Sequence, residues 1–165
     1  MNGDGTDGGL FRGLFRGTGA EPVDSPPHLI SLLADGSDTG MSFSVIRVDL
    51  RPGFDGAAPH THNGFAELLY VIDGVVEVLS GEKTARAGAG DLVVVTPGAA
   101  HAFGALRDGP ASLLAVIGPG IDRFQYFREL AKVANGAVPA LAPEIPGRYD
   151  SRLVDSPVWR RARSG

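Results

Sequence analysis

The feature that most constrains the fold of this chain is a succession of about eight short apolar segments separated by turn-forming residues. The segments are residues 29–34, 41–50, 66–72, 75–80, 83–87, 92–96, 101–106 and 112–118. Every connection contains glycine, proline or aspartate, and Asp73-Gly74 predicts a tight hairpin turn. Segments that recur about every 8–12 residues indicate an antiparallel sandwich or barrel. We therefore expect an all-β fold.

The composition supports this expectation and restricts the chemistry. The 165 residues include 24 Gly and 12 Pro, which suits many short strands joined by turns and does not suit a helical bundle. The chain contains no cysteine, so disulfides, thiolate metal sites and cysteine nucleophiles are excluded. A metal ion would therefore have to be bound by imidazole and carboxylate groups.

Charge and hydropathy exclude two classes of partner. The formal net charge is −4, so no basic field would attract nucleic acid. No apolar run approaches the roughly 18 residues that a membrane-spanning helix needs. Residues 1–9 combine acidic residues with glycine, where a secretory signal would need positive charge followed by an apolar stretch. We expect no nucleic-acid or membrane partner and a cytoplasmic location.

Changes in sequence texture divide the chain into four parts. These are a flexible tail at 1–27, a barrel at 28–120, a helix at 121–136 and an extended tail at 137–165. The first tail contains the near-repeat GLFRGLFR at residues 9–16, which either folds over its own domain or docks onto a partner. Phe124, Phe127 and Leu130 recur at helical spacing. We expect the aromatic face of this helix to pack against the outside of the barrel.

Three of the four histidines fall in two short segments, together with one glutamate. His60 and His62 are two residues apart, so in a strand both side chains project from the same face. Glu67 follows at an odd offset, and the intervening Asn-Gly pair supplies the bend that could return it to that face. His101 begins another strand after a Pro-Gly turn. Three neutral imidazoles and a carboxylate suit one divalent transition metal ion, such as Fe, Ni, Mn, Co, Cu or Zn.

These motifs resemble those of a known family. HTHNGFAE at residues 60–67, followed by Gly74, resembles the first motif of the cupins, and GDLVVVTPGAAHAF at residues 90–103 resembles the second. The resemblance covers residues 29–118 and implies an antiparallel double-stranded β-helix, the cupin or jelly-roll barrel, here followed by the C-terminal α-helix. The metal ligands that it implies are His60, His62, Glu67 and His101. His28 lies outside both motifs, and we expect it to be incidental.

Cupin folds carry many chemistries, so the resemblance leaves three functions open. The first is a metal-dependent dioxygenase of a small aromatic or phenolic, quercetin-like compound, because residues 117–130 resemble the end of bacterial quercetinase-like cupins. Glu67 would then be both a metal ligand and the catalytic proton acceptor, with dioxygen as co-substrate. The second is a redox-neutral isomerase, cyclase, lyase or epimerase whose metal is only a Lewis acid. The third is a small-ligand-binding cupin without turnover.

Strand parity indicates which side chains would form the substrate pocket. Phe103 lies two residues beyond His101, and Leu69 lies two beyond Glu67, so both should share the inward face. Phe65 belongs to the first motif itself. Aromatic and aliphatic walls of this kind favour a planar apolar substrate.

Arg47 is the charged candidate for the pocket wall. By parity it shares a strand face with Met41, Phe43 and Val45. An inward Arg47 would bind a carboxylate or a phenolate, whereas an outward position is the commoner one for an arginine in a strand. The sequence leaves both orientations open.

The segment LISLLA at residues 29–34 is apolar enough to need cover from a partner sheet. Small cupins usually pair, and symmetric dimers are the commonest oligomers. We therefore expect a homodimer, with a small-molecule substrate as the other partner.

Overall fold

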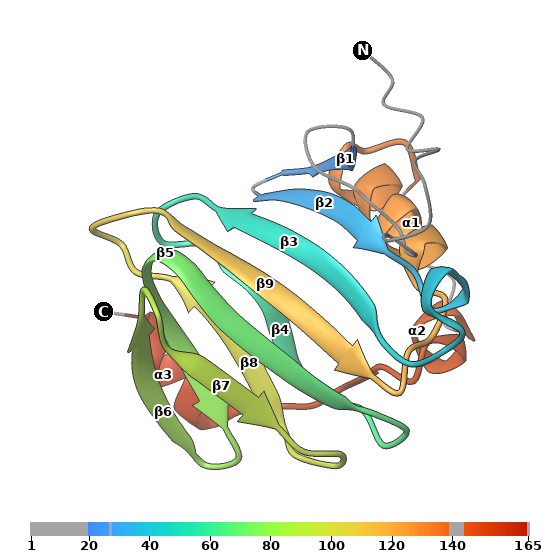
Figure 1. The fold of residues 1–165 in the computed structure, drawn as a ribbon. Coiled ribbons are helices and arrows are strands. Elements are labelled where there is room, and N and C mark those ends of the chain that lie inside the picture. The colour runs from blue at the N-terminus through green and yellow to red at the C-terminus, as the bar shows by residue number, and fades with distance from the viewer. Residues whose placement is uncertain (1–19, 27, 139–143, 165) are drawn as a thin grey trace.

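The computed structural model describes residues 20–26, 28–138 and 144–164, which form ten strands and a few short helices (Figure 1). The strands are β1 (Glu21–Ser25), β2 (His28–Ala34), β3 (Ser44–Leu50), β4 (Asp55–Thr61), β5 (Ala66–Ser80), β6 (Lys83–Gly88), β7 (Leu92–Val95), β8 (His101–Ala105), β9 (Ala111–Gly118) and β10 (Arg152–Leu153). The helices are η1 (Ser37–Thr39), α1 (Phe124–Ala134), α2 (Glu144–Arg148) and α3 (Pro157–Arg163). All the strand pairs are antiparallel, which confirms the predicted all-β class.

The strands form two layers that share the long strand β5. One layer runs β1-β2-β3-β9-β5, and the first part of β5 also pairs with β7. The last part of β5 pairs with β6 and β8, and β8 leads through β4 to β10. Figure 1 shows β2, β3, β9 and β5 as one curved sheet with β4 and β8 behind it. The core fills the space between the layers, because both turn apolar side chains inward.

The predicted hairpin at Asp73-Gly74 is wrong, because these residues bend β5 instead of ending it. The pairing register with β9 shifts between Val71 and Asp73. Gly74 has φ of 74°, and a Cβ atom there would lie 2.1 Å from the carbonyl oxygen of Pro110. Only glycine fits this approach, and the bend lets one strand serve both layers.

In β3 inward and outward side chains alternate as predicted, but the buried side chains are those of the even-numbered residues and not of the odd-numbered ones. Ile46, Val48 and Leu50 are buried at 9%, 3% and 2% exposure. Met41 precedes the strand and is exposed, and Arg47 lies on the outward face. The three apolar side chains form an uninterrupted inward face, whereas a charged Arg47 would be costly to bury.

The sequence predicts a flexible tail at 1–27, but the last part of this segment belongs to the sheet. Residues 21–25 form β1, which pairs with the edge of β2. Val23 and Ser25 turn inward and are buried, so this segment contributes to the core. The apolar segment 29–34 is therefore covered along its edge by its own chain. The repeat at residues 9–16 lies outside the described residues.

Helix α1 matches the helix predicted at 121–136, but it is not on the outside of the barrel. The backbone N–H groups of Arg123 and Phe124 donate to the carboxylate of Asp35 at 2.7 and 3.2 Å, which fixes the start of the helix. Phe127 and Ile46 line the same cavity. The aromatic face of α1 therefore closes the open side of the barrel, because inward side chains of β2 and β3 need cover there.

The segment after residue 143 forms a strand and a packed helix, whereas the sequence predicts an extended tail at 137–165. β10 adds a short strand to the edge of β4. Ser156 caps α3 by accepting from the N–H of Trp159, whose side chain is 3% exposed and packs on Leu79 and Ala102. Within the described segments, no helix has the length and apolar character to cross a membrane.

Candidate metal centre and cavity

Four side chains with metal-binding atoms converge inside the barrel. His60 comes from β4, His62 follows that strand, Glu67 lies on β5 and His101 begins β8. Their ligand atoms all lie within 4.8 Å of one another. All four residues are buried, and His101 is fully inaccessible to solvent. The structure thus brings together the complete set that the sequence predicts.

Pairing of the strands explains the convergence. His60 and His101 are direct cross-strand partners, and their ring centroids are 4.1 Å apart. The chain bends after His62 and returns Glu67 to the cluster, as the Asn-Gly pair predicts. One oxygen of Glu67, Oε2, lies 3.3 Å from Nε2 of His62 and 3.1 Å from Nε2 of His101.

The bend itself is held from the C-terminal side of the chain. Oδ2 of Asp150 accepts the backbone N–H groups of Asn63 and Gly64 at 2.8 and 2.6 Å. β10, which follows, pairs Leu153 with His60. The segment after residue 143 therefore braces the backbone that carries two of the ligands.

Backbone carbonyls fix which nitrogen of each ring carries the proton. Nδ1 of each histidine lies within 2.9 to 3.0 Å of a carbonyl oxygen, namely Ala58 for His60, Phe65 for His62 and Ala99 for His101. A carbonyl only accepts, so Nδ1 must donate, and in a neutral ring the lone pair is then on Nε2. All three lone pairs are thus available in one small space, the arrangement that outer contacts impose on metal-bound histidines.

The electrostatics of the cluster favour a shared cation. Burial and the neighbouring His101 lower the pKa of His60 to about 4, so this ring is neutral at physiological pH. Burial alone would raise the pKa of Glu67, but the rings of His101 and His62 and the charge of Arg123 outweigh it, and the pKa lies below its usual range. One carboxylate together with imidazole nitrogens suits a divalent transition metal ion.

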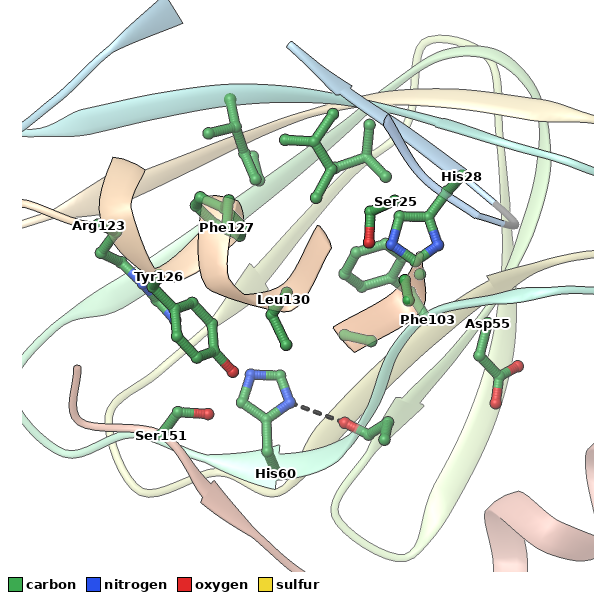
Figure 2. A pocket seen from close by; sticks show the side chains of 18 of the residues that line it. Ser25, His28, Asp55, His60, Phe103, Arg123, Tyr126, Phe127, Leu130 and Ser151 are labelled. Carbon is green, nitrogen blue, oxygen red and sulfur yellow. Dashed lines mark hydrogen bonds between the residues drawn. The ribbon is translucent and has the colours of Figure 1, made fainter. Parts of the chain in front are cut away.

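A cavity of about 480 Å³ adjoins this cluster. His60 and Glu67 form one side of it, and the other walls are mainly apolar side chains from β2, β3, β9 and α1. Figure 2 shows His60 facing Tyr126 and Leu130 across this space, with Phe103 on another wall. A bound molecule would therefore meet the metal ligands at one end and apolar surface elsewhere.

The predicted pocket residues separate into three groups. Phe103 lines the cavity. Phe65 stacks on His62 with ring centroids 4.0 Å apart, and Leu69 is 1% exposed in the core, so both support the site from behind. Arg47 does not reach the cavity, because its guanidinium bonds Asp49 at 2.8 to 3.1 Å on the outer face.

Several cavity residues lie in parts of the chain that the sequence placed outside the site. Arg123, Tyr126 and Phe127 come from the start of α1, and His28 comes from β2. Helical spacing predicted an apolar face on α1 but not which surface it would cover. His28 is more than incidental: it lines the cavity with an unpaired buried Nδ1, and burial lowers its pKa. No pattern in the sequence pointed to it.

Comparison with known proteins agrees with this geometry. Residues 46–117 match the family model described as cupin domain. Comparison with curated protein sequences gave no match. Among solved structures, the chain is similar to KdgF from Halomonas sp., at 22% identity and a TM-score of 0.55, over 64% of this chain and 93% of that one. A predicted oxalate decarboxylase from Thermotoga maritima matches at 20% identity and a TM-score of 0.56, over 64% of this chain and 97% of that one.

A third similar structure is described as a sugar phosphate isomerase from a cupin superfamily, from Silicibacter pomeroyi. It matches at 26% identity and a TM-score of 0.50, over 57% of this chain and 60% of that one. The first two likenesses, at 20% and 22% identity, show a shared fold and nothing finer.

Proposed function

This chain belongs to the cupin superfamily through residues 46–117, and from that premise we propose that it is a metal-dependent enzyme, a dioxygenase of a small aromatic or phenolic compound. The observation that carries the proposal is the position of the three-histidine, one-glutamate cluster at the wall of a largely apolar cavity of about 480 Å³. A ring system would fit between the aromatic and aliphatic walls and reach the metal end.

The residues of the chain have separate tasks in this reaction. His60, His62, Glu67 and His101 would hold a divalent ion, which supplies a Lewis acid and a path for electrons to dioxygen. Glu67 is ionised at neutral pH and faces the cavity, so it accepts the proton of a substrate hydroxyl. The substrate supplies the electrons, dioxygen is the oxidant, and both oxygen atoms enter the products.

The apolar side chains on the cavity walls would support this role by limiting the contact of a bound substrate with water. Phe103 and Phe127 lie on the lining, and both are buried, at 4% and 9% exposure. A water-poor environment strengthens electrostatic contacts and limits side reactions of an oxidised intermediate.

A redox-neutral reaction is the second candidate. It is favoured by the 26% identical structure from Silicibacter pomeroyi, which is described as a sugar phosphate isomerase. In this case the metal would only polarise the substrate, and a base would move a proton without any need for dioxygen.

Oxygen uptake separates these candidates. The metal-loaded protein would be tested on a panel of phenolic compounds in an oxygen electrode, with substrate loss followed in parallel under air and under nitrogen. We expect one dioxygen consumed per substrate lost under air, and no turnover under nitrogen. Turnover that is equal under nitrogen would establish the redox-neutral candidate, and no turnover of any compound under either gas would favour a non-catalytic ligand-binding protein.

Glu67→Gln tests the proton acceptor. The amide keeps the size of the side chain but loses its charge, so metal should bind more weakly and the base is removed. We expect Glu67→Gln to stay nearly inactive after reloading with excess metal. Glu77→Gln is the matched control, because Glu77 lies on the same strand but pairs with Arg86 at 3.7 Å and does not line the cavity. Recovery of most of the rate by reloaded Glu67→Gln would place the base elsewhere.

We also propose that two copies of the chain associate. The supporting feature is an exposed apolar patch on the outer face of β5 and β7. Its members are Tyr70, Ile72, Leu92 and Val94, each 42% to 57% exposed. Tyr70 and Leu92 are cross-strand partners, so these side chains form one surface. A second copy would remove it from water, and light scattering at high protein concentration would reveal the dimer. The cytoplasmic location stays a prediction from the sequence.

A further inference from the structure

Arg123 is a buried cation at the wall of the cavity. Its residue exposure is 6%, it precedes the first turn of α1, and it lines the same space as His60 and Glu67 (Figure 2). Its Nε atom is buried and has no hydrogen-bond partner among the residues that the structure describes. Within the part of the chain that the structure describes, its guanidinium makes no ion pair.

A buried charge without a partner is costly, and the protein offsets only part of this cost. The Cζ atom of Arg123 lies 5.3 Å from the ring centroid of Phe65, 5.3 Å from that of Tyr126 and 5.7 Å from that of Phe127. These rings attract the positive charge. They do not replace an oxygen acceptor for the guanidinium N–H groups, which form a fork suited to a carboxylate.

The carboxylates near Arg123 are all engaged elsewhere. Glu67, Asp150 and Asp35 are close enough to oppose the lowering of the pKa of Arg123 that burial causes. Glu67 faces His62 and His101. Asp150 accepts two backbone N–H groups of the metal-ligand bend, and Asp35 accepts two at the start of α1. None of these three nearby carboxylates forms an ion pair with the guanidinium.

We propose that Arg123 binds the carboxylate group of the molecule that occupies the cavity. The ligand class is then a small monocarboxylic acid with an apolar, ring-sized body that fits between the cavity walls. A single carboxylate matches the site better than a phosphate, because Arg123 is the one Lys or Arg among the described lining residues. That this acid is a substrate rests on the proposed function, whereas its binding does not.

The test compares benzoate with benzamide, which has nearly the same shape and no charge. Both would be titrated calorimetrically into the metal-loaded full chain. We expect benzoate to bind about tenfold more tightly than benzamide, in line with the strength of a charge-assisted hydrogen bond over a neutral one. A preference below about twofold in the unaltered protein would overturn the proposal without any variant.

Arg123→Gln separates the contribution of the guanidinium to benzoate affinity from that of the metal ion, which would attract benzoate in every form of the protein. We expect this variant to lose about tenfold in benzoate affinity and to bind benzamide unchanged. Arg128→Gln is the matched control: it removes the same charge from the same helix, but Arg128 pairs with Glu21 on the surface. Equal benzoate affinity in Arg123→Gln and the unaltered protein would show that Arg123 only supports the packing of α1.

Arg123→Lys covers the case in which the glutamine variant does not fold. Lysine keeps the charge but not the fork, so we expect a preference for benzoate that is smaller than in the unaltered protein. A preference of undiminished size in Arg123→Lys would overturn the proposal. The outcome is also separable from that of the oxygen experiment. A benzoate preference that depends on Arg123, in a protein that consumes no oxygen, would disprove the dioxygenase and keep the carboxylate site.

Discussion

The cluster of four candidate metal ligands and the segments that close the cavity differ in how they are built. The four ligands lie within 42 residues of sequence, on strands whose pairing places them together. The closing segments, α1 and the chain after residue 143, lie beyond the region that matches the cupin family model. They supply Arg123, one wall of the cavity and the brace on the metal-ligand bend. The part that matches the family model thus holds the candidate metal ligands, and the part outside the match forms walls of the cavity beside them.

This difference gives the two regions different sensitivities. The ligands sit on a barrel whose core rests on apolar strands, so a change in a ligand should affect the metal more than the fold. The closing segments depend on a few anchoring contacts, so their loss should affect stability and ligand binding more than the metal. Three substitutions test this contrast.

His101→Ala should have the largest effect, and on the metal alone. His101 is fully buried, and its Nε2 faces Glu67 at 3.1 Å. Its removal leaves three of the four metal ligands. We therefore expect metal affinity to fall by at least about 100-fold, which is more than the loss caused by changing a residue that only contacts a ligand. The far-ultraviolet circular dichroism spectrum should remain that of a β protein. Metal content by elemental analysis and a thermal melt would measure both.

His28→Ala is the matched control for this change. His28 lines the cavity but lies outside the cluster, so its removal should leave one metal ion per chain. Full metal content in His101→Ala would contradict the assignment of the site. Unfolding of the apo barrel would contradict the claim that the ligands and the core are independent.

Trp159→Ala should have the next largest effect, and on stability. The indole is 3% exposed, packs on Leu79 and Ala102, and donates from Nε1 to Asp55 at 3.0 Å. We expect the free energy of unfolding to fall by about 3–5 kcal/mol, as for other buried aromatic side chains. Leu153→Ala is the control, because Leu153 is 74% exposed and should change stability by no more than about 0.5 kcal/mol. Equal urea midpoints for the two variants would show that α3 is not an anchor.

Three of the four ligands could be predicted from sequence because their geometry is local, whereas His101 follows from the second motif of the family resemblance. His60 and His62 share a strand face, and the Asn-Gly pair before Glu67 gives the bend that returns this side chain. Gly74 belongs to the first motif, but it bends β5 where the sequence predicts a hairpin turn. A strand that bends and one that turns back use the same Asp-Gly dipeptide, and only the approach of Pro110 distinguishes them.

The cavity walls could not be predicted because they depend on packing between distant segments. The predicted face of β3 rests on Met41, Phe43 and Val45, of which the first two precede the strand. On that parity Arg47 is a candidate for a cavity wall that it does not reach. The apolar spacing predicts a helix at 121–136, and the structure has it at Phe124–Ala134. Which surface it covers depends on Asp35, 88 residues away from Arg123, and no local pattern reports that contact.

Asp150→Asn should have the smallest effect, at the contact that joins the two regions. Asp150 has φ of 49°, which asparagine tolerates, so the change removes the charge with little strain. Burial would raise the pKa of Asp150, but the N–H groups of Gly64 and Asn63 outweigh it, and the pKa lies below its ordinary value of 3.8. The contact is at the surface, so we expect a loss of no more than about 1 kcal/mol at neutral pH, and a fall in metal affinity of about tenfold.

The pH dependence of this loss identifies its cause. Because the pKa of Asp150 is lower in the folded protein than in the unfolded chain, its stabilisation is complete above the ordinary pKa and disappears as pH falls through the folded value. The difference in unfolding free energy between the two proteins, measured in urea, should therefore be constant from neutral pH down to about pH 5 and shrink below about pH 4. A difference that persists undiminished in acid would mean that the shape of the side chain, and not its charge, braces the metal-ligand bend. Metal affinity that is unchanged in Asp150→Asn at neutral pH would show that the closing segments and the metal cluster are energetically separate.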